Sequence, residues 1–160
     1  MQSRVARGAT TVAGDATPEQ VLKATRPVHN AGRGECLFYS FMYHLAQRGQ
    51  YFPGPQALRK AAVDYALSHW TRYKDFALDP VTLEGFSSRR AFAERFLQPG
   101  VYGDHVILHA LCRRFHVAAY VVVIGADGKP SEPVKTCRHP GWPIFPYRYE
   151  GFHYEALAAA

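Results

Sequence analysis

The chain has 160 residues, of which 48% are hydrophobic and 20% are charged, values that are ordinary for one globular domain. A domain of this length buries roughly two-thirds of its unfolded surface and folds without disulfides or a structural metal. The longest apolar stretch, Val117 to Ile124, is far shorter than the roughly 20 residues of a membrane-spanning helix. No apolar block followed by a small-residue cleavage site is visible near the N-terminus. We therefore expect neither a membrane span nor a secretory signal.

An excess of basic residues, 19 Lys and Arg against 13 Asp and Glu, gives a net charge of +6. Such a charge would suit an acidic partner such as nucleic acid. The basic residues nevertheless occur as separate pairs among acidic residues, for example Arg59-Lys60 and Arg113-Arg114, and not as basic runs. The pattern disfavours a dedicated nucleic-acid-binding role, which is the weakest of our three functional hypotheses.

The three cysteines, Cys36, Cys112 and Cys137, are odd in number and lack the spacing of a disulfide framework. They suit a reducing compartment such as the cytoplasm and leave at least one thiol free. The role of a free thiol is therefore the first functional question that the sequence raises.

The N-terminal part of the chain is polar and rich in small residues, with glycines and prolines that interrupt any periodicity. We interpret residues 1–27 as a flexible tail or linker that contains one weak helix over residues 18–24. The domain proper is expected to span residues 28–157.

Four segments of the domain show the periodicity of amphipathic helices. Apolar residues recur at helical spacing from Cys36 until Gly49, which suits a helix end. Pro55 suits the first position of a second helix, and Ser87 or Ser88 can cap a third. The expected helices cover residues 36–48, residues 55–73, the segment from that serine cap to residue 97, and residues 104–115.

Strand signals dominate the last third of the chain. The near-continuous valines of residues 118–124 predict a strand that is buried on both faces. Asp127-Gly128 predicts a turn, and shorter strands are expected at residues 133–136, 144–149 and 152–157. Because helices come first and strands second, the predicted fold class is α+β.

Cys36 follows two glycines and opens an apolar helix, in the segment Gly32-Arg33-Gly34-Glu35-Cys36-Leu37-Phe38. The unpaired amides and the dipole of a helix N-terminus favour the thiolate, which is the nucleophilic form of cysteine, and can lower its pKa. The same turn can direct backbone N–H groups at a developing oxyanion. The alternative interpretation is that Cys36 is a small buried residue beside Leu37 and Phe38.

A thiolate nucleophile needs a histidine partner, and position alone does not select one of the eight histidines, although His153 stands out modestly. It lies in the last expected strand between Phe152 and Tyr154, and Glu155 follows two residues later on the same strand face. A carboxylate in that position could orient the imidazole and stabilise its protonated form. The alternative is a half-buried histidine without a catalytic role.

Three segments, in this order, resemble sequence blocks of the ovarian-tumour (OTU) family of papain-like cysteine proteases. Residues 34–41, Gly-Glu-Cys-Leu-Phe-Tyr-Ser-Phe, are similar to its nucleophile motif, usually Asp-Gly-Asn-Cys-Leu-Phe followed by a helix. Residues 102–111 are similar to its Trp-Gly-Gly/Asp helix, which leads into a hydrophobic strand. Phe152-His153-Tyr154 is similar to its closing His-Tyr block. The resemblance covers most of residues 28–157.

The resemblance implies a papain-like OTU fold, with helices packed around a small central β-sheet, and the activity of a deubiquitinase. Such an enzyme hydrolyses the peptide or isopeptide bond after the C-terminal glycine of ubiquitin, polyubiquitin or a ubiquitin-like modifier. Cys36 would be the nucleophile, His153 the general base and acid, and Glu155 the residue that orients His153. The chemistry needs no metal or cofactor, and no membrane partner is implied. A viral protein or a bacterial effector that acts in the host cytosol would fit the sequence.

The nucleophile motif departs from the family pattern at two positions. Arg33 replaces the usual Asp and Glu35 replaces the usual Asn, whereas the resemblance implies an oxyanion hole made by the backbone amides of Arg33, Gly34 and Glu35. A Glu35 carboxylate that points inward would oppose both the thiolate and the oxyanion. The usual third member of the triad, Asp or Asn, is Glu155 here, with Asn30 as a second candidate. These changes leave open a catalytically impaired, ubiquitin-binding module as the second hypothesis.

The tail of ubiquitin is extended, carries arginines and ends in two glycines, so its channel should offer acidic walls and aromatic lids. Asp104 and Glu150 are the expected acidic contacts. Trp142, Tyr149 and Phe152 are the expected aromatic lids.

The expected helix over residues 104–115 places His105, His109, Cys112 and His116 on one stripe. Histidine and cysteine four residues apart can share zinc. A zinc protease is excluded because Val106 stands where its helix motif requires Glu. We interpret this stripe as partly buried, hydrogen-bonded side chains and expect no metal site.

Overall fold

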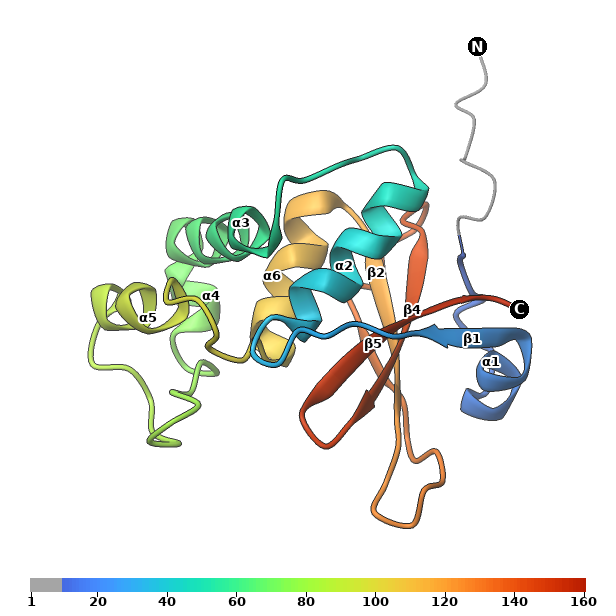
Figure 1. Cartoon of the computed structure of the whole chain (residues 1–160). Coiled ribbons are helices and arrows are strands. Elements are labelled where there is room, and N and C mark those ends of the chain that lie inside the picture. Colours follow the sequence, from blue (N-terminus) through green and yellow to red (C-terminus); the bar gives the residue numbers. More distant parts are fainter. Residues whose placement is uncertain (1–9) are drawn as a thin grey trace.

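A computed structural model describes residues 10–160 and shows a five-stranded sheet with helices on both of its faces (Figure 1). The strand order is β1-β5-β4-β2-β3, with β2 and β4 parallel and the other neighbours antiparallel. The mixed helix and strand content agrees with the predicted class. No helix within residues 10–160 is long and apolar enough to cross a membrane. The helices are α1 (Pro18–Ala24), α2 (Cys36–Gln47), α3 (Pro55–Ser68), α4 (Trp70–Tyr73), α5 (Arg89–Phe96) and α6 (His105–Phe115), and the strands are β1 (Thr25–Val28), β2 (Ala118–Val123), β3 (Val134–Thr136), β4 (Ile144–Glu150) and β5 (His153–Ala159).

Strand β2 is buried on both faces, as its valine content predicted. Ala119 and Val121 belong to the larger core, which also contains buried residues of α2, α3 and α6. Tyr120 and Val122 face a smaller apolar cluster that includes Val21 of α1. Successive side chains of a strand point to opposite faces of its sheet, so one run of apolar residues supplies both layers.

The expected helices are confirmed, with one break. The helix expected over residues 55–73 divides into α3 and α4 at His69, whose φ and ψ of −125° and 37° are not helical. After this break the Trp70 ring packs against Phe92 of α5, with 5.1 Å between ring centres. Side-chain caps begin the two later helices: Ser88 accepts from the Ala91 amide and Asp104 from the Ile107 amide.

The N-terminal boundary needs correction, because residues 10–27 are packed onto the domain and do not form a free tail. The expected helix is α1, and its Val21 is buried against the second face of the sheet. The following residues form β1, the edge strand that pairs with β5 in the register Thr25↔Ala159 and Val28↔Ala156. A four-residue edge strand offers too little periodicity to be read from sequence. The part of the expected tail that comprises residues 1–9 lies outside the described residues.

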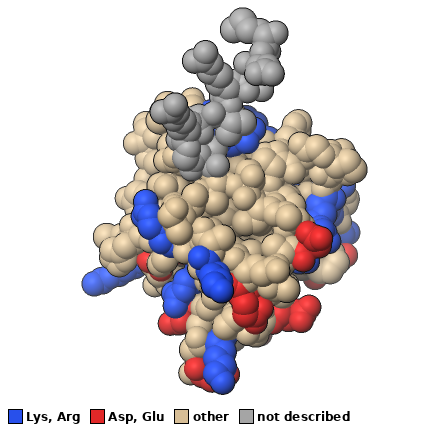
Figure 2. Space-filling model, turned by 90° about the vertical axis from the view of Figure 1, so that its right-hand side faces the viewer, with Lys and Arg blue, Asp and Glu red and all other residues tan. Residues whose placement is uncertain are grey.

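Basic and acidic side chains are interspersed on the face seen in Figure 2, where Lys and Arg stand as separate groups. This arrangement corresponds to the isolated basic pairs of the sequence.

His44 makes the stability of the fold depend on pH. It is buried in α2, its Nε2 donates to the Pro146 carbonyl at 2.7 Å, and its ring stacks on Phe145. Burial lowers the pKa of His44 to about 4, because the cation would lose its hydration. The unfolded chain therefore binds the proton more strongly, and the stabilisation present above pH ~6.5 is lost as the pH falls toward 4.

We predict that the free energy of unfolding of the wild type falls by up to roughly 3 kcal/mol more between pH 7 and pH 4 than that of His44→Gln. Glutamine keeps a donor for the Pro146 carbonyl but does not titrate. Urea denaturation at several pH values measures the difference. Parallel pH profiles for the two proteins would contradict the assignment.

Candidate active site

Cys36 is the first residue of α2, and its buried side chain lies against the tip of the β4–β5 hairpin. Its sulfur accepts a hydrogen bond from the Tyr154 N–H at 3.4 Å. The thiol also lies 3.7 Å from the Phe152 carbonyl oxygen, to which it donates. The structure thus brings the thiol beside the two residues that flank His153, although 116 residues separate Cys36 from Phe152.

The hairpin that carries His153 has a two-residue loop. Glu150 pairs with His153, which leaves Gly151 and Phe152 as the loop residues, with φ of 54° and 67°. Positive φ at both central positions defines the type I′ turns that suit tight hairpins, and this conformation strains a phenylalanine. The turn leaves Phe152 74% exposed at the hairpin tip while its carbonyl faces Cys36.

Glu155 lies next to His153, as the strand alternation predicted. Its Oε2 is 3.6 Å from His153 Nε2 and its residue is only 9% exposed. The same carboxylate is 3.3 Å from His29 Nδ1 and 3.8 Å from Arg148 Nη1, two neighbours that the sequence did not reveal. Within the described residues, the Cys36 thiol and the His153 ring form no hydrogen bond in this conformation. Their catalytic pairing stays a prediction.

The pKa of Cys36 is raised, in contrast to the expected lowering. Burial is the largest cause, and the Glu35 carboxylate also raises it. The amides of Tyr154 and Leu37 act in the opposite direction by hydrogen bonding to the sulfur. The helix N-terminus therefore favours the thiolate as expected, but the loss of hydration outweighs it. The thiol is protonated at rest and needs a base to become nucleophilic.

The turn of residues 33–35 precedes α2 and offers free backbone donors. In the described part of the chain, the amides of Arg33, Gly34 and Glu35 donate no hydrogen bond. Gly34 lies so close to Gly100 that a Cβ at this position would be 1.7 Å from the Gly100 carbonyl oxygen. The absence of a side chain at Gly34 thus allows the turn to pack against Gly100. The oxyanion hole in this turn stays a prediction.

Asn30 and Ser40 connect the segment around Cys36 to β5 by hydrogen bonds. The Asn30 amide group donates to the Tyr154 carbonyl at 3.0 Å, and its oxygen accepts from the Gly32 N–H at 3.1 Å. The Ser40 hydroxyl lies 3.1 Å from the same Tyr154 carbonyl and 2.8 Å from the Cys36 carbonyl. Asn30, the second candidate for orienting the histidine, therefore holds backbone in place. Ser40 was missed because a serine inside an amphipathic helix carries no distinctive signal.

A cavity of about 520 Å³ opens beside the hairpin tip. Its walls include Asp104, Tyr149 and Phe152, three of the predicted substrate contacts, together with the exposed Leu83. Asp104 also caps α6, where one carboxylate oxygen accepts from the Ile107 N–H at 2.9 Å. Burial raises the pKa of Asp104. The cavity and the Cys36 sulfur share Phe152 and Tyr154 as neighbours.

Trp142 and Glu150 do not line this cavity. Trp142 precedes the other end of β4, about 20 Å from the hairpin at 3.3 Å per residue, and stacks between His116 and His139. The structure therefore does not bring Trp142 to the cavity with the other expected lids, because proximity to a strand in sequence does not tell which end of the strand carries the site. Glu150 lies at the hairpin but is exposed and pairs with Arg148 at 3.0 Å.

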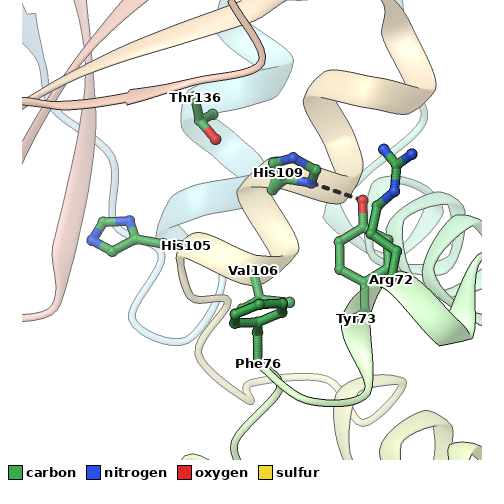
Figure 3. A pocket seen from close by; sticks show the side chains of 7 residues that line it. All are labelled: Arg72, Tyr73, Phe76, His105, Val106, His109 and Thr136. Atoms are coloured by element: carbon green, nitrogen blue, oxygen red, sulfur yellow. Dashed lines mark hydrogen bonds between the residues drawn. The ribbon is translucent and has the colours of Figure 1, made fainter.

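The histidine stripe of α6 is distributed among separate neighbours. A second cavity of about 310 Å³ lies beside α4 and α6, where His109 Nδ1 is 2.8 Å from the Tyr73 hydroxyl (Figure 3). His105 Nδ1 is 2.5 Å from the Tyr154 hydroxyl, and Cys112 is buried in the core. Within residues 10–160, no three His, Cys, Asp or Glu side chains are grouped so as to hold a metal ion.

Solved structures show which class of fold this is. The chain is similar to the viral OTU domain protease of Dera Ghazi Khan virus, with a TM-score of 0.70 and 12% identity over 88% of this chain and 84% of that one. It is similar to the Hazara virus OTU bound to ubiquitin, with a TM-score of 0.66 and 12% identity over 88% and 85% of the two chains. It is also similar to an OTU deubiquitinase from Wolbachia pipientis wMel bound to ubiquitin, with a TM-score of 0.64 and 16% identity over 86% of this chain and 97% of that one.

The protein therefore has the fold of OTU deubiquitinase domains, as the sequence resemblance implied. No protein-family model and no curated protein matches the sequence. At these identities the shared architecture lies in the arrangement of helices and sheet, and the site must be judged from its own residues.

We predict that Gly34→Ala destabilises the protein by about 2 kcal/mol or more, because the new methyl group would overlap the Gly100 carbonyl. Gly54→Ala is the matched control, since a Cβ there meets no atom within 4 Å and φ is 175°. Thermal unfolding compares the two variants. Equal stability of Gly34→Ala and the wild type would show that this backbone contact is not a constraint.

Proposed function

We propose that this protein is a cysteine deubiquitinase that hydrolyses the bond after the C-terminal glycine of ubiquitin or a ubiquitin-like modifier. The observation that carries the proposal is the contact of the Cys36 sulfur with the hairpin residues on either side of His153. The shared fold with OTU deubiquitinases, two of them bound to ubiquitin, supports the choice of substrate.

In the proposed reaction, His153 takes the proton of the Cys36 thiol and the thiolate attacks the carbonyl carbon of the terminal glycine. With Nε2 directed at Glu155, Nδ1 is the ring nitrogen left to accept this proton. The free amides of the turn before Cys36 stabilise the oxyanion. The protonated His153 then gives its proton to the leaving amine, and water hydrolyses the thioester to return the thiol.

The protonated Cys36 thiol and the position of His153 support activation of the enzyme as substrate binds. Burial raises the pKa of Cys36, so the thiol holds its proton until the base approaches. His153 lies on the strand that touches the sulfur and is 36% exposed in its side chain, which leaves the ring room to turn. We propose that the bound ubiquitin tail completes this alignment.

The cavity beside the hairpin is the proposed channel for the ubiquitin tail. Asp104 offers a carboxylate for an arginine of the tail, and Tyr149 and Phe152 offer ring faces for its glycines. The exposed apolar residues Leu78 and Leu83 also line this cavity and would contact the globular part of ubiquitin.

A ubiquitin with a thiol-reactive group at its C-terminus should form one covalent adduct with the wild type and none with Cys36→Ala. Intact-protein mass spectrometry detects the added mass. Cys137→Ser is the matched control and should react like the wild type, because Cys137 is half-buried at a distance from the hairpin and bonds to the His109 carbonyl. An adduct that persists in Cys36→Ala would refute the assignment of the nucleophile.

The same experiment separates the enzyme from the ubiquitin-binding module. The absence of any adduct, together with saturable binding of unmodified ubiquitin, would favour the module. Binding to RNA or DNA that weakens steeply with salt, without binding to ubiquitin, would favour the third hypothesis.

Asp104→Asn should raise KM for a ubiquitin substrate about tenfold while kcat changes little, because one charge-assisted hydrogen bond to an arginine is weakened. Asparagine retains the oxygen that caps α6. Glu150→Gln removes a carboxylate outside the cavity and should leave KM within about twofold of the wild type. Steady-state kinetics measures kcat and KM for the two variants. Equal KM values would contradict a role of Asp104 in binding the ubiquitin tail.

A further inference from the structure

Arg59, on α3, carries a guanidinium group that is completely buried. Its Nη1 donates to the Phe96 carbonyl at 2.9 Å, and its Nη2 donates to the Val101 carbonyl at 2.7 Å and to the Gly34 carbonyl at 3.3 Å. Nη2 also pairs with the Glu35 carboxylate. Taking a charge out of water costs several kcal/mol unless it is paired and hydrogen-bonded, so a buried cation of this kind needs an explanation.

The partners of Arg59 belong to two segments that meet at the site. Gly34 and Glu35 form the turn immediately before Cys36. Phe96 ends α5, and Val101 leads into Asp104 in the cavity wall.

Glu35 strengthens the same junction. Its carboxylate accepts from the Gly100 N–H at 2.8 Å, and the Gly34 backbone packs on Gly100. One guanidinium and one carboxylate thus join the nucleophile turn to the wall of the proposed channel.

We propose that Arg59 is a positioning residue for the Cys36 site: through Glu35 and the Gly34 carbonyl it holds the oxyanion turn in place and neutralises the carboxylate beside the nucleophile. The inference rests on the proposed function of Cys36 and deepens it. It also explains how this chain tolerates Glu35, at a position where the resemblance led us to expect asparagine.

The electrostatic part of the argument concerns the thiolate. The Glu35 carboxylate next to Cys36 disfavours the negative sulfur and raises the pKa of Cys36, whereas a guanidinium nearby favours the thiolate. Removal of one partner of the pair should therefore shift the Cys36 pKa in the opposite direction from removal of the other. The facing hairpin carries His153 and the phenols of Tyr149 and Tyr154, and burial raises the pKa values of both phenols so that they stay neutral. The carboxyl groups of Asp104 and Glu155 lie beside these residues. They are unchanged in the variants below.

The test uses the full chain and four variants: Arg59→Met, Glu35→Gln, the double variant Arg59→Met/Glu35→Gln, and Arg59→Lys. Arg90→Met is the matched control, because Arg90 lies on α5 in an exposed ion pair with Glu94. Thermal unfolding establishes that each protein is folded. The readouts are kcat, KM and the pH dependence of kcat/KM with ubiquitin that carries a fluorogenic C-terminal amide.

We expect Arg59→Met to lower kcat at least about tenfold while KM stays within about twofold, because the turn loses its anchor. The acid limb of kcat/KM should move about one pH unit upward, because Glu35 is left unpaired. Glu35→Gln should move the limb downward, because the cation is then unpaired. The double variant should return the limb to its wild-type position while kcat stays low. A purely structural role would not shift the limb in opposite directions.

Folded Arg59→Met and Glu35→Gln proteins with wild-type kcat and an unmoved acid limb would overturn the proposal. If Arg59→Met does not fold, the Glu35→Gln and Arg59→Lys variants test the proposal instead. Lysine keeps the positive charge but lacks the planar guanidinium, so Arg59→Lys should lower kcat and leave the acid limb of kcat/KM at its wild-type pH. Arg90→Met should match the wild type in every readout.

A failure of the proposed function is recognised separately. If the wild type releases no fluorophore from ubiquitin, the deubiquitinase assignment fails. The rate of Cys36 alkylation by iodoacetamide as a function of pH, followed on the Cys36 peptide by mass spectrometry, then replaces the enzymatic readout. Opposite shifts of this profile in Arg59→Met and Glu35→Gln would support the ion pair, and unchanged profiles would overturn it.

Discussion

The packing of α2 against β5 is the constraint on which the whole site depends. A helix from the first half of the chain and its last strand meet so closely that the Cys36 sulfur accepts a backbone N–H of β5. Ser40, one turn further along α2, contacts the Tyr154 carbonyl through its hydroxyl, and Asn30 donates to the same carbonyl. Apolar burial brings the two elements together, but these polar contacts set the position of helix and strand along each other. The chemistry of the thiol follows from this register.

Features that cost free energy are concentrated around this junction. Phe152 has a positive φ, the thiol of Cys36 is buried, and the Arg59 guanidinium is removed from water. Each would be unfavourable alone, and each is held by neighbours: the hairpin pairing, the amides at the start of α2 and the Glu35 carboxylate. Strain and buried charge that persist in a fold are typical of functional sites, because the surrounding structure supplies the stability they lack.

The likeness to viral and bacterial OTU structures at 12–16% identity shows that sequences with few identical residues can form the same fold. In this chain the fold rests on a strand with apolar residues on both faces and on helices with one apolar face. Individual site residues can change if their neighbours compensate. Glu35 pairs with Arg59, whose own burial requires a carboxylate. Neither residue is understandable without the other.

Local features of this protein were readable from the sequence because a few adjacent residues encode them. The start of α2 at Cys36, the Ser88 cap of α5 and the two-sided burial of β2 follow from periodicity and capping, and the alternation along β5 placed Glu155 beside His153.

Distances across the fold were not readable. Only the tertiary structure decided that residues 10–27 pack onto the domain and that β1 joins its sheet. It also decided that Trp142 stands at the far end of β4, that His29 lies beside Glu155 and that Arg59 pairs with Glu35. Burial also reversed the expected direction of the Cys36 pKa. The physical reason is the same in each case: these properties arise from contacts between segments far apart in the chain, whereas periodicity and capping report only on near neighbours.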